Sequence, residues 1–317
     1  MWKKIVKNNK ISSLHRCTKA NCSFRIPIRI LQLLLIFCIF SCTKSNQIHH
    51  PYRLAICAMF KNEAPWLKEW ILYHHQILGV EHFYLYNNDS TDNYREVLQP
   101  FIDQHIVELI DWSSDDPTHH ASGAYMDAPW SASQLGSYNH CLKKAKGEAK
   151  WVAMIDIDEF IVPVKKISRF YHLLDKAQKD KIGAVCLHWR VFGTSDVNDL
   201  APGEYLMEKL TWRSLDNHGW NQHVKSIYQP EGVSSCLVHV PEKLSPGFGL
   251  LHLKAKQVRL HHYWFRTNKH SLEKRKMSAS THPDFFKEFH QKEDRSALPY
   301  VSDLKKLNPI NQDQRGK

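Results

Sequence analysis

The segment 53–110 constrains the fold most, because short apolar runs alternate in it with helical patterns. The run RLAICAMF (53–60) predicts a buried strand. After Pro65, apolar residues recur at helical spacing as far as Gly79, which is placed to cap the helix. A strand and a helix follow again, and Ile106–Ile110 predicts a third strand. Strands joined by helices in this way pair in parallel, so the segment predicts an α/β fold with a doubly wound sheet.

A further apolar run, Trp151–Ile155, leads directly into Asp156 and Asp158. A buried strand must leave the core at its end, so we expect both carboxylates at the C-terminal edge of the sheet, where open α/β folds bind ligands. Two hard oxygen ligands at that place suit a divalent cation that holds a diphosphate. The alternative is a strand end followed by a solvated turn, so the pair needs support from the rest of the chain.

Composition argues against a disordered chain and against a polyanion-binding surface. A chain of 317 residues with 43% hydrophobic content can bury a large core. Its formal net charge is +11, but residues 1–50 hold nine Lys or Arg and no Asp or Glu, so the rest of the chain is close to neutral. The basic charge belongs to an N-terminal arm, and no nucleic-acid partner is expected.

The basic arm (1–29) precedes the apolar run ILQLLLIFCIFSC (30–42). A helix over this run would span about 20 Å, which is short of the ~30 Å hydrocarbon core of a bilayer. We therefore expect a short signal anchor or the core of a signal peptide, and a mis-assigned start or a buried helix is the alternative. The expected protein is membrane-associated through this single segment, with a cytoplasmic location as the alternative.

The remaining organisation is predicted from changes in pattern. Residues 43–52 form a polar linker, 53–270 the main domain, and 271–317 a polar C-terminal helix and tail. Beyond Val191 the pattern breaks into short segments with Gly, Pro and His, which predicts a less regular, substrate-facing lobe. Eight cysteines without a C-x-x-C spacing indicate neither a disulfide scaffold nor a structural zinc site.

Several stretches together resemble glycosyltransferases of the GT-A fold, most closely family 92 and the related family 2. They are ICAMFKNEAPWLKEWILYHHQILGVEHFYLYNNDSTDN (56–93), SQLGSYNHCL (133–142), WVAMIDIDEFIVP (151–163), HWRVFGTS (188–195), KSIYQP (225–230) and HHYWFRTNKHS (261–271). No single stretch is specific, but their ordered co-occurrence is. The resemblance implies a GT-A fold with a mostly parallel sheet and a C-terminal acceptor lobe.

The same resemblance implies a metal-dependent hexosyltransferase. Its donor would be a nucleotide sugar, a UDP-sugar above all, and its acceptor a hydroxyl group of a glycan or another molecule. Eukaryotic members of family 92 suggest UDP-galactose as the donor and a lumenal domain behind a signal anchor.

The loops that close the first two strands are adjacent in a doubly wound sheet, and such loops line the nucleotide crevice. The resemblance assigns nucleotide binding to these loops together with the first aspartate of the acidic pair. The residues are Lys61, Asn62, Glu63, Asn88, Asp89 and Asp156. For the loop 88–92 the alternative is a capped turn without a ligand.

Asp156 and Asp158 match the DxD motif of the family, which implies Mn²⁺ or Mg²⁺ bridged to the diphosphate. A histidine at a strand end is usually structural. The family places a His-Tyr pair here, however, so His262 is the expected third metal ligand. Glu159 either orients one of the metal ligands without binding the metal itself, or simply begins the next turn.

Lys225 lies in the KSIYQP stretch, and the resemblance suggests that it neutralises the departing diphosphate. A solvated surface lysine is the alternative, and Arg266 and Lys269 are weaker candidates for the same task.

The acceptor hydroxyl needs a base if the transfer inverts the anomeric centre, and a carboxylate or histidine from the lobe after the acidic pair would supply it. Asp196, directly after the FGTS loop, is the first choice. Glu204, Glu208 and Asp216 remain open.

A haloacid-dehalogenase-like phosphatase is the main alternative, because its motif also places Asp-x-Asp after an apolar strand. That motif usually continues with Thr, Gly or Val and needs an acidic pair downstream, whereas Glu159-Phe160 follows here and no Asp-Asp occurs later. A nucleotidyltransferase would need a Gly-rich, basic loop after its first strand, and KNEAPW contains no Gly. A catalytically inactive sugar-nucleotide-binding domain stays open.

Overall fold

The computed structural model describes residues 50–121, 129–275 and 286–307. Residues 48–317 form one compact unit, to which the described residues belong. The expected basic arm and apolar run (1–42) lie outside the described residues. Within the described part of the chain, no helix is long and apolar enough to cross a membrane.

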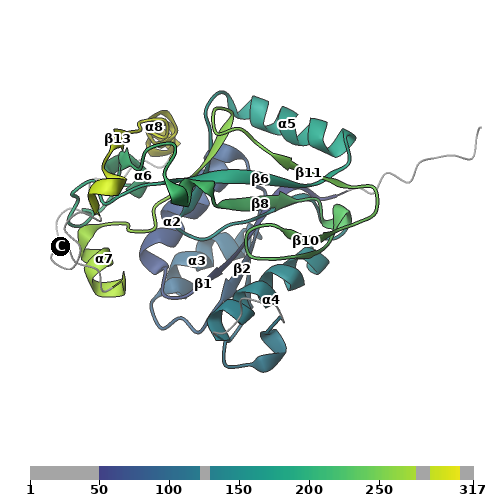
Figure 1. The fold of residues 1–317 in the computed structure, drawn as a ribbon. Coiled ribbons are helices and arrows are strands. Elements are labelled where there is room, and N and C mark those ends of the chain that lie inside the picture. The colour runs from purple at the N-terminus through teal and green to yellow at the C-terminus, as the bar shows by residue number, and fades with distance from the viewer. Residues whose placement is uncertain (1–49, 122–128, 276–285, 308–317) are drawn as a thin grey trace, which may run out of the picture. The chain divides into compact units, whose positions relative to one another are not determined.

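The unit is of mixed α/β class, and Figure 1 shows helices packed around a central sheet. Its α-helices are α2 (Ala64–Leu72), α3 (Tyr94–Asp103), α4 (Pro129–Lys144), α5 (Ile167–Lys179), α6 (Leu206–Lys209), α7 (Asn268–Arg275) and α8 (Leu298–Leu307). A π-helical segment, η1 (Tyr73–Leu78), continues α2, and the 3-10 turns are η2 (Pro117–His119), η3 (Gly219–Gln222), η4 (Pro230–Gly232) and η5 (Phe286–Phe289). The strands are β1 (Tyr52–Phe60), β2 (His82–Asn87), β3 (Val107–Asp111), β4 (Ala149–Met154), β5 (Glu159–Pro163), β6 (Ile182–Val191), β7 (Trp212–Arg213), β8 (Val224–Tyr228), β9 (Val233–Cys236), β10 (Pro241–Leu244), β11 (Gly249–His252), β12 (Val258–His262) and β13 (Lys292–Glu293).

The main sheet has the strand order β3-β2-β1-β4-β8-β6-β12-β5, and β11 pairs with β6 outside this path. Its first half is parallel, because β1 pairs in parallel with β2 and β4, and β2 with β3. β8 lies antiparallel between β4 and β6, and β5 is antiparallel to β12. The predicted α/β fold with a doubly wound, mostly parallel sheet is confirmed.

The two faces of β1 show why the sheet is covered on both sides. Successive side chains of a strand point to opposite faces, and β1 is apolar at nearly every position. Leu54 and Ile56 join a core cluster that contains residues of α2, α3, α5 and α8. Ala55 and Cys57 join the opposite cluster, which contains residues of α4. The described cysteines are free and buried, as expected of small apolar side chains.

Helix α2 and its continuation η1 position the start of β5. Gly79 ends this segment in the left-handed region at φ 86°, which suits a glycine. Within the segment, the Trp70 indole donates a hydrogen bond to the Glu159 carbonyl oxygen at 2.8 Å, and the Tyr73 phenol donates to the Ile161 carbonyl oxygen at 2.8 Å. Both bonds fix the strand that follows the acidic pair.

Strand pairing brings Lys225 and His262 to the turn that carries Asp156 and Asp158. β4 ends at Met154, which pairs with Ser226 of β8, so Lys225 lies next to the point where the chain leaves the sheet. The chain then crosses to β5, where Glu159 pairs with His262 of β12. Side chains from β8 and β12 therefore flank the turn that carries the acidic pair.

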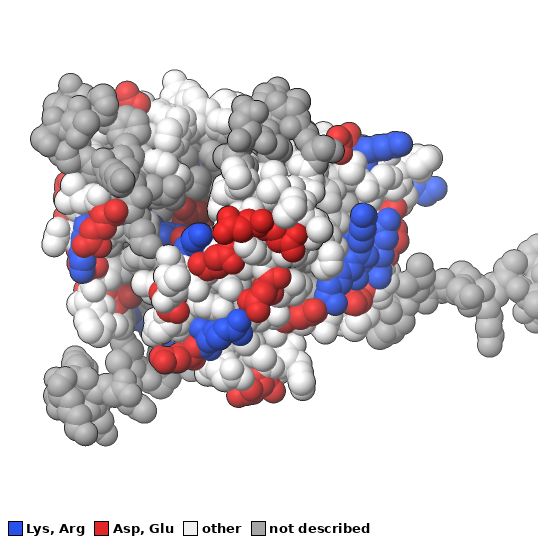
Figure 2. All heavy atoms as spheres, turned by 90° about the horizontal axis from the view of Figure 1, so that it is seen from below, with Lys and Arg blue, Asp and Glu red and all other residues white. Residues whose placement is uncertain are grey.

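Surface charge on this unit is mixed on the face seen from below. Figure 2 shows Lys and Arg interspersed with Asp and Glu on that face, and the acidic side chains gather near its centre. This face therefore carries no continuous basic surface.

Candidate functional site

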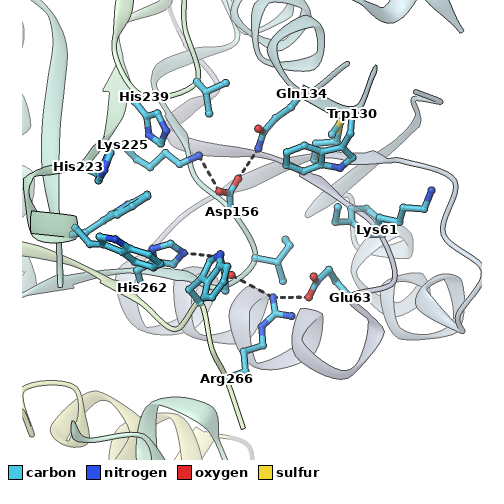
Figure 3. A pocket seen from close by; sticks show the side chains of 18 of the residues that line it. Lys61, Glu63, Trp130, Gln134, Asp156, His223, Lys225, His239, His262 and Arg266 are labelled. Atoms are coloured by element: carbon cyan, nitrogen blue, oxygen red, sulfur yellow. Dashed lines mark hydrogen bonds and ion pairs between the residues drawn. The ribbon is translucent and has the colours of Figure 1, made fainter. Parts of the chain in front are cut away.

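A pocket of about 560 Å³ lies at the edge of the sheet where β1 and β4 end. This volume falls within the range of about 300 to 1,000 Å³ that is typical of small-molecule sites. Figure 3 shows Asp156 near its centre, with Lys61, Trp130 and Glu63 on one side and His223, His239 and His262 on the other.

Asp156 is held in the pocket by three donors of the chain. The Asp156 side chain is 30% exposed, and its Oδ2 lies 3.0 Å from the ammonium group of Lys225. Its Oδ1 accepts hydrogen bonds from the Gln134 amide at 3.0 Å and from the Tyr138 phenol at 2.9 Å. Burial and the charge of Asp156 hold the pKa of Tyr138 well above its usual value, so the phenol stays protonated and donates.

Lys225 is a buried cation rather than a surface lysine. Its side chain is 1% exposed, and its ammonium group also donates to the Tyr138 oxygen at 3.3 Å and lies 4.0 Å from Glu159. Burial opposes the charged form, but the carboxylates of Asp156 and Glu159 raise the pKa of Lys225 above its usual value. The ammonium group is therefore charged in the pocket wall.

Glu159 supports the acidic turn from inside the protein. It is fully buried, and its Oε2 accepts a hydrogen bond from the backbone N–H of Asp156 at 2.8 Å. Burial raises the pKa of Glu159 to about 7, although the nearby Lys225 lowers it. Of the two roles considered for this residue, the geometry favours orienting the turn.

A chain of charged groups connects the second aspartate to the loop after β1. His262 Nε2 lies 3.5 Å from Asp158 Oδ1, and Arg266 Nη2 lies 3.9 Å from Asp158 Oδ2. The same Arg266 atom lies 2.6 Å from Glu63 Oε2, and Figure 3 shows this connection below Asp156. Burial disfavours the charged imidazole, but the neighbouring Asp158 raises the pKa of His262 above its usual value.

The donor chemistry of the acidic turn fits a divalent cation. Asp156 and Asp158 provide carboxylate oxygens, and His262 Nδ1 is buried without a hydrogen-bond partner among the described residues. Those residues contain no cluster of three or more His, Cys, Asp or Glu side chains arranged to hold a metal. The arrangement therefore suits a cation that takes one or two carboxylates from the protein and further oxygens from phosphate groups, as Mg²⁺ commonly does.

The residues assigned to nucleotide binding divide into two groups. Lys61 and Glu63 line the pocket together with Asp156. Asn62, in contrast, joins two loops: its Oδ1 accepts a hydrogen bond from the backbone N–H of Thr91 at 2.7 Å.

Asn88 and Asp89 are also absent from the pocket wall that the described residues form. Asn88 is fully buried, and its amide donates to the Trp112 carbonyl oxygen at 2.9 Å and to Ser114 Oγ at 2.6 Å. Asp89 accepts a hydrogen bond from Ser113 Oγ at 2.8 Å. These contacts tie the loop after β2 to the loop after β3.

The structure does not bring Asp196 to the pocket. Its side chain is 92% exposed and lies 3.7 Å from His290 Nδ1. The other carboxylates considered as the base face cations elsewhere: Glu204 pairs with Lys209 and Asp216 with Arg213. Glu208 pairs with Lys305.

Sequence reasoning missed much of the uncharged part of the pocket. Gln134 and Tyr138 lie in the stretch 133–142, which is one of the stretches that resemble the family. Their position in that stretch could have indicated that they belong to the site. The aromatic lining was not foreseen, because tryptophans scattered over distant segments give no local pattern. It includes Trp130, Trp189, Trp220 and Trp264, with the imidazoles of His223 and His239.

Comparison with known proteins gives matches over most of the described chain. Residues 50–307 match the family model described as glycosyltransferase family 92. A glycosyltransferase family 92 protein of Ricinus communis is 28% identical over 225 residues, which cover 68% of this chain and 36% of that protein. The galactan beta-1,4-galactosyltransferase GALS3 of Arabidopsis thaliana is 27% identical over 72% of this chain and 44% of its own length. The chain thus spans less than half the length of these relatives.

Among solved structures, S. aureus TarS 1-349 in complex with UDP is similar with a TM-score of 0.41 and 11% identity. The similar region covers 67% of this chain and 60% of that one.

Proposed function

Because this chain belongs to glycosyltransferase family 92, we propose that it transfers a sugar from a nucleotide sugar to an acceptor hydroxyl group. One observation carries the proposal. A pocket at the ends of the parallel strands joins a carboxylate pair, Asp156 and Asp158, to the buried cation Lys225. An acidic pair and a cation at this edge of an α/β sheet suit a diphosphate and its counter-ion.

The donor is proposed to be UDP-galactose, since a relative is named as a galactan beta-1,4-galactosyltransferase. Lys61 and Glu63, at the end of β1, would contact the nucleotide. Their loop borders the end of β2, where doubly wound sheets hold the ribose and base. The diphosphate would then lie toward Asp156, and the galactose beyond it.

Mn²⁺ or Mg²⁺ is proposed to bind at Asp156 and Asp158, with His262 beside them. When bound, the cation would neutralise negative charge on the diphosphate. The chain's own residues prepare this site: Gln134 and Tyr138 orient Asp156, and Glu159 holds its backbone.

Transfer breaks the bond between the anomeric carbon and the diphosphate oxygen and forms a bond to the acceptor oxygen. Negative charge then builds on the leaving diphosphate. The Lys225 ammonium group is already fixed by Tyr138 and Asp156, so it can stabilise that charge without reorganising. The acceptor proton leaves with a base. Asp196, the base predicted from the sequence, lies outside the pocket lining and is not assigned this role.

A panel of nucleotide sugars tests this proposal. The full chain is incubated with each UDP-sugar and GDP-sugar in Mn²⁺, with and without EDTA, and released nucleotide is measured. We expect release from UDP-galactose that EDTA abolishes. Release of inorganic phosphate instead, from simple phosphate esters and without any requirement for a nucleotide sugar, would support the phosphatase alternative and contradict the proposal.

The N-terminal segment 30–42 is proposed to associate the protein with a membrane. Its apolar composition and the basic residues before it support this proposal.

A further inference from the structure

One wall of the pocket is aromatic and lies apart from the nucleotide loops. Trp189 of β6, Trp220 of η3 and Trp264 after β12 line the pocket and are called the tryptophan wall here. The rings of His223 and His239 lie 5.0 and 5.6 Å from the Trp189 ring. Figure 3 shows both imidazoles on the opposite side of Asp156 from Lys61.

Two rings of the wall are fixed by a buried aromatic cluster. Trp220 and Trp264 meet edge to face, with centroids 5.5 Å apart and planes at 89°. Behind them, the ring of Phe265 is fully buried, stacks parallel to Trp220 at 6.2 Å and meets Trp264 at 4.9 Å. A ligand that binds here meets pre-ordered rings, so little side-chain entropy is lost on binding.

The third ring carries a polar atom that the protein leaves unused. Trp189 Nε1 is buried and has no hydrogen-bond partner among the described residues. Its ring also lies 4.3 Å from the ring of His262, beside the acidic pair. Buried donors are nearly always paired, so an N–H without a protein partner in a pocket wall can donate to a ligand acceptor or to water at this place.

The position of the wall determines which part of the reaction it serves. In the proposed donor pose, Lys61 and Glu63 contact the nucleotide, and the diphosphate would lie at the acidic pair. In a transfer that inverts the anomeric centre, the acceptor approaches the anomeric carbon from the side opposite the diphosphate. Trp189 lies beside His262, and the neighbouring His223 and His239 lie across Asp156 from Lys61, where we place the acceptor.

The chemistry of the wall identifies the class of acceptor. A lipid chain would need a continuous apolar surface, but imidazoles of His223, His239 and His262 interrupt this one. A pyranose ring has an apolar face, which packs on an indole ring, and hydroxyl groups at its edge, which pair with indole and imidazole nitrogens.

We propose that the tryptophan wall binds and selects the acceptor, and that the acceptor is an oligosaccharide. One pyranose ring packs on Trp220 and Trp264, and one of its hydroxyl groups accepts a hydrogen bond from Trp189 Nε1. The proposal rests on the proposed transferase function and adds the residues that select the acceptor.

An oligosaccharide array tests the proposal with the full chain in UDP and Mn²⁺. The array holds galacto-, gluco-, xylo- and manno-oligosaccharides, and the affinity for the best of them is then measured by titration. We expect Trp220→Ala and Trp264→Ala to weaken that affinity about tenfold or more, and Trp189→Phe, which keeps a ring but loses the N–H, to weaken it several-fold. Trp212→Ala is the matched control, because Trp212 is 41% exposed and lies outside the pocket lining.

The affinity for UDP is the second readout, since the wall variants should bind UDP as the wild type does. Where Trp220→Ala does not fold, Trp220→Leu keeps an apolar side chain but loses the stacking ring, and the same loss of saccharide affinity is expected. The inference is overturned if the wild type binds no saccharide, or if the wall variants bind as tightly as Trp212→Ala. Failure of the proposed function would differ, because UDP binding and UDP-sugar turnover would then be missing in the wild type.

Discussion

At the scale of single residues, Lys225 is a buried ammonium group between two carboxylates and a phenol. In the variant Lys225→Met, Asp156 loses its closest cation. We expect turnover of the nucleotide sugar to fall about a hundredfold, because a fixed positive charge at the leaving group is lost. The free energy of unfolding should fall by about 3 kcal/mol, because removing one partner leaves a buried charge uncompensated. Steady-state kinetics and urea unfolding measure the two effects.

Lys269→Met is the control for this variant. Lys269 is 53% exposed and pairs with Asp199 at 2.9 Å, and exposed pairs of this kind contribute little. Turnover and stability should both stay close to wild type. If Lys225→Met also turned over at the wild-type rate, Lys225 would have no part in the reaction.

The sequence predicted the charged residues of the pocket better than its neutral ones. Asp156, Asp158 and Lys225 belong to short motifs whose chemistry is distinctive, and the structure brings them to one pocket. Asn88 was assigned to nucleotide binding through the resemblance, with a capped turn as the alternative. The structure shows the bracing contact, to the Trp112 carbonyl oxygen.

At the scale of elements, the helices and parallel strands of the first half were predictable because each is amphipathic or apolar over its whole length. The antiparallel insertion of β8 and the pairing of β12 with β5 were not. Their register depends on partners far along the chain, such as Glu159 with His262, and no local pattern encodes it.

Gly136 allows helix α4 to pack closely on the loop before it. A Cβ atom at this position would lie 1.8 Å from the carbonyl oxygen of His119. In Gly136→Ala the gain in helix propensity is about 1 kcal/mol, but a clash with backbone atoms costs more. We expect a lower melting temperature and weaker UDP binding, because Gln134 on the same helix moves. Gly219→Ala is the control, since its Cβ would meet nothing within 4 Å. An unchanged or higher melting temperature for Gly136→Ala would contradict the packing described.

Glu69 makes the N-terminus of α6 sensitive to pH. Its carboxylate accepts hydrogen bonds from the backbone N–H groups of Leu206 at 2.7 Å and Met207 at 3.0 Å. Burial raises the pKa of Glu69 from 4.5 to about 7, although these bonds lower it. Between these two values the folded protein keeps a proton that the unfolded chain releases. The ionisation of Glu69 therefore makes the free energy of unfolding fall as pH rises from about 4.5 to about 7. This decrease is at most about 3 kcal/mol.

The variant Glu69→Gln cannot titrate at this position. Urea unfolding of both proteins between pH 4.5 and 8 should show a stability difference that shifts in favour of the variant as pH rises and levels off above about pH 7. A difference that is constant over this range would show that the burial of Glu69 does not perturb its ionisation.

At the scale of the whole molecule, the chain divides between an N-terminal segment and one compact unit, residues 48–317. The sequence places nine basic residues and the longest apolar run before residue 51. Deletion of residues 1–47 should therefore give a soluble domain that folds and binds UDP as the full chain does. Size-exclusion chromatography and calorimetric titration check this result. An insoluble product, or a loss of UDP binding, would show that the N-terminal segment is part of the folded unit.

The family was predictable from the sequence because its motifs follow one another in a fixed order along 56–271, and the match over 50–307 confirms it. The acceptor side was not predictable, because the tryptophan wall is assembled only when β6, η3 and the segment after β12 come together.

The central claim is that Asp156 and Asp158 hold a cation that the transfer requires. The most direct test measures release of UDP from UDP-galactose against Mn²⁺ concentration for the wild type and for Asp158→Asn, which keeps the side-chain volume but removes a charged oxygen ligand. We predict a fall in turnover of about a thousandfold with little change in melting temperature. An Asp158→Asn protein with normal turnover and an unchanged dependence on Mn²⁺ would contradict the account.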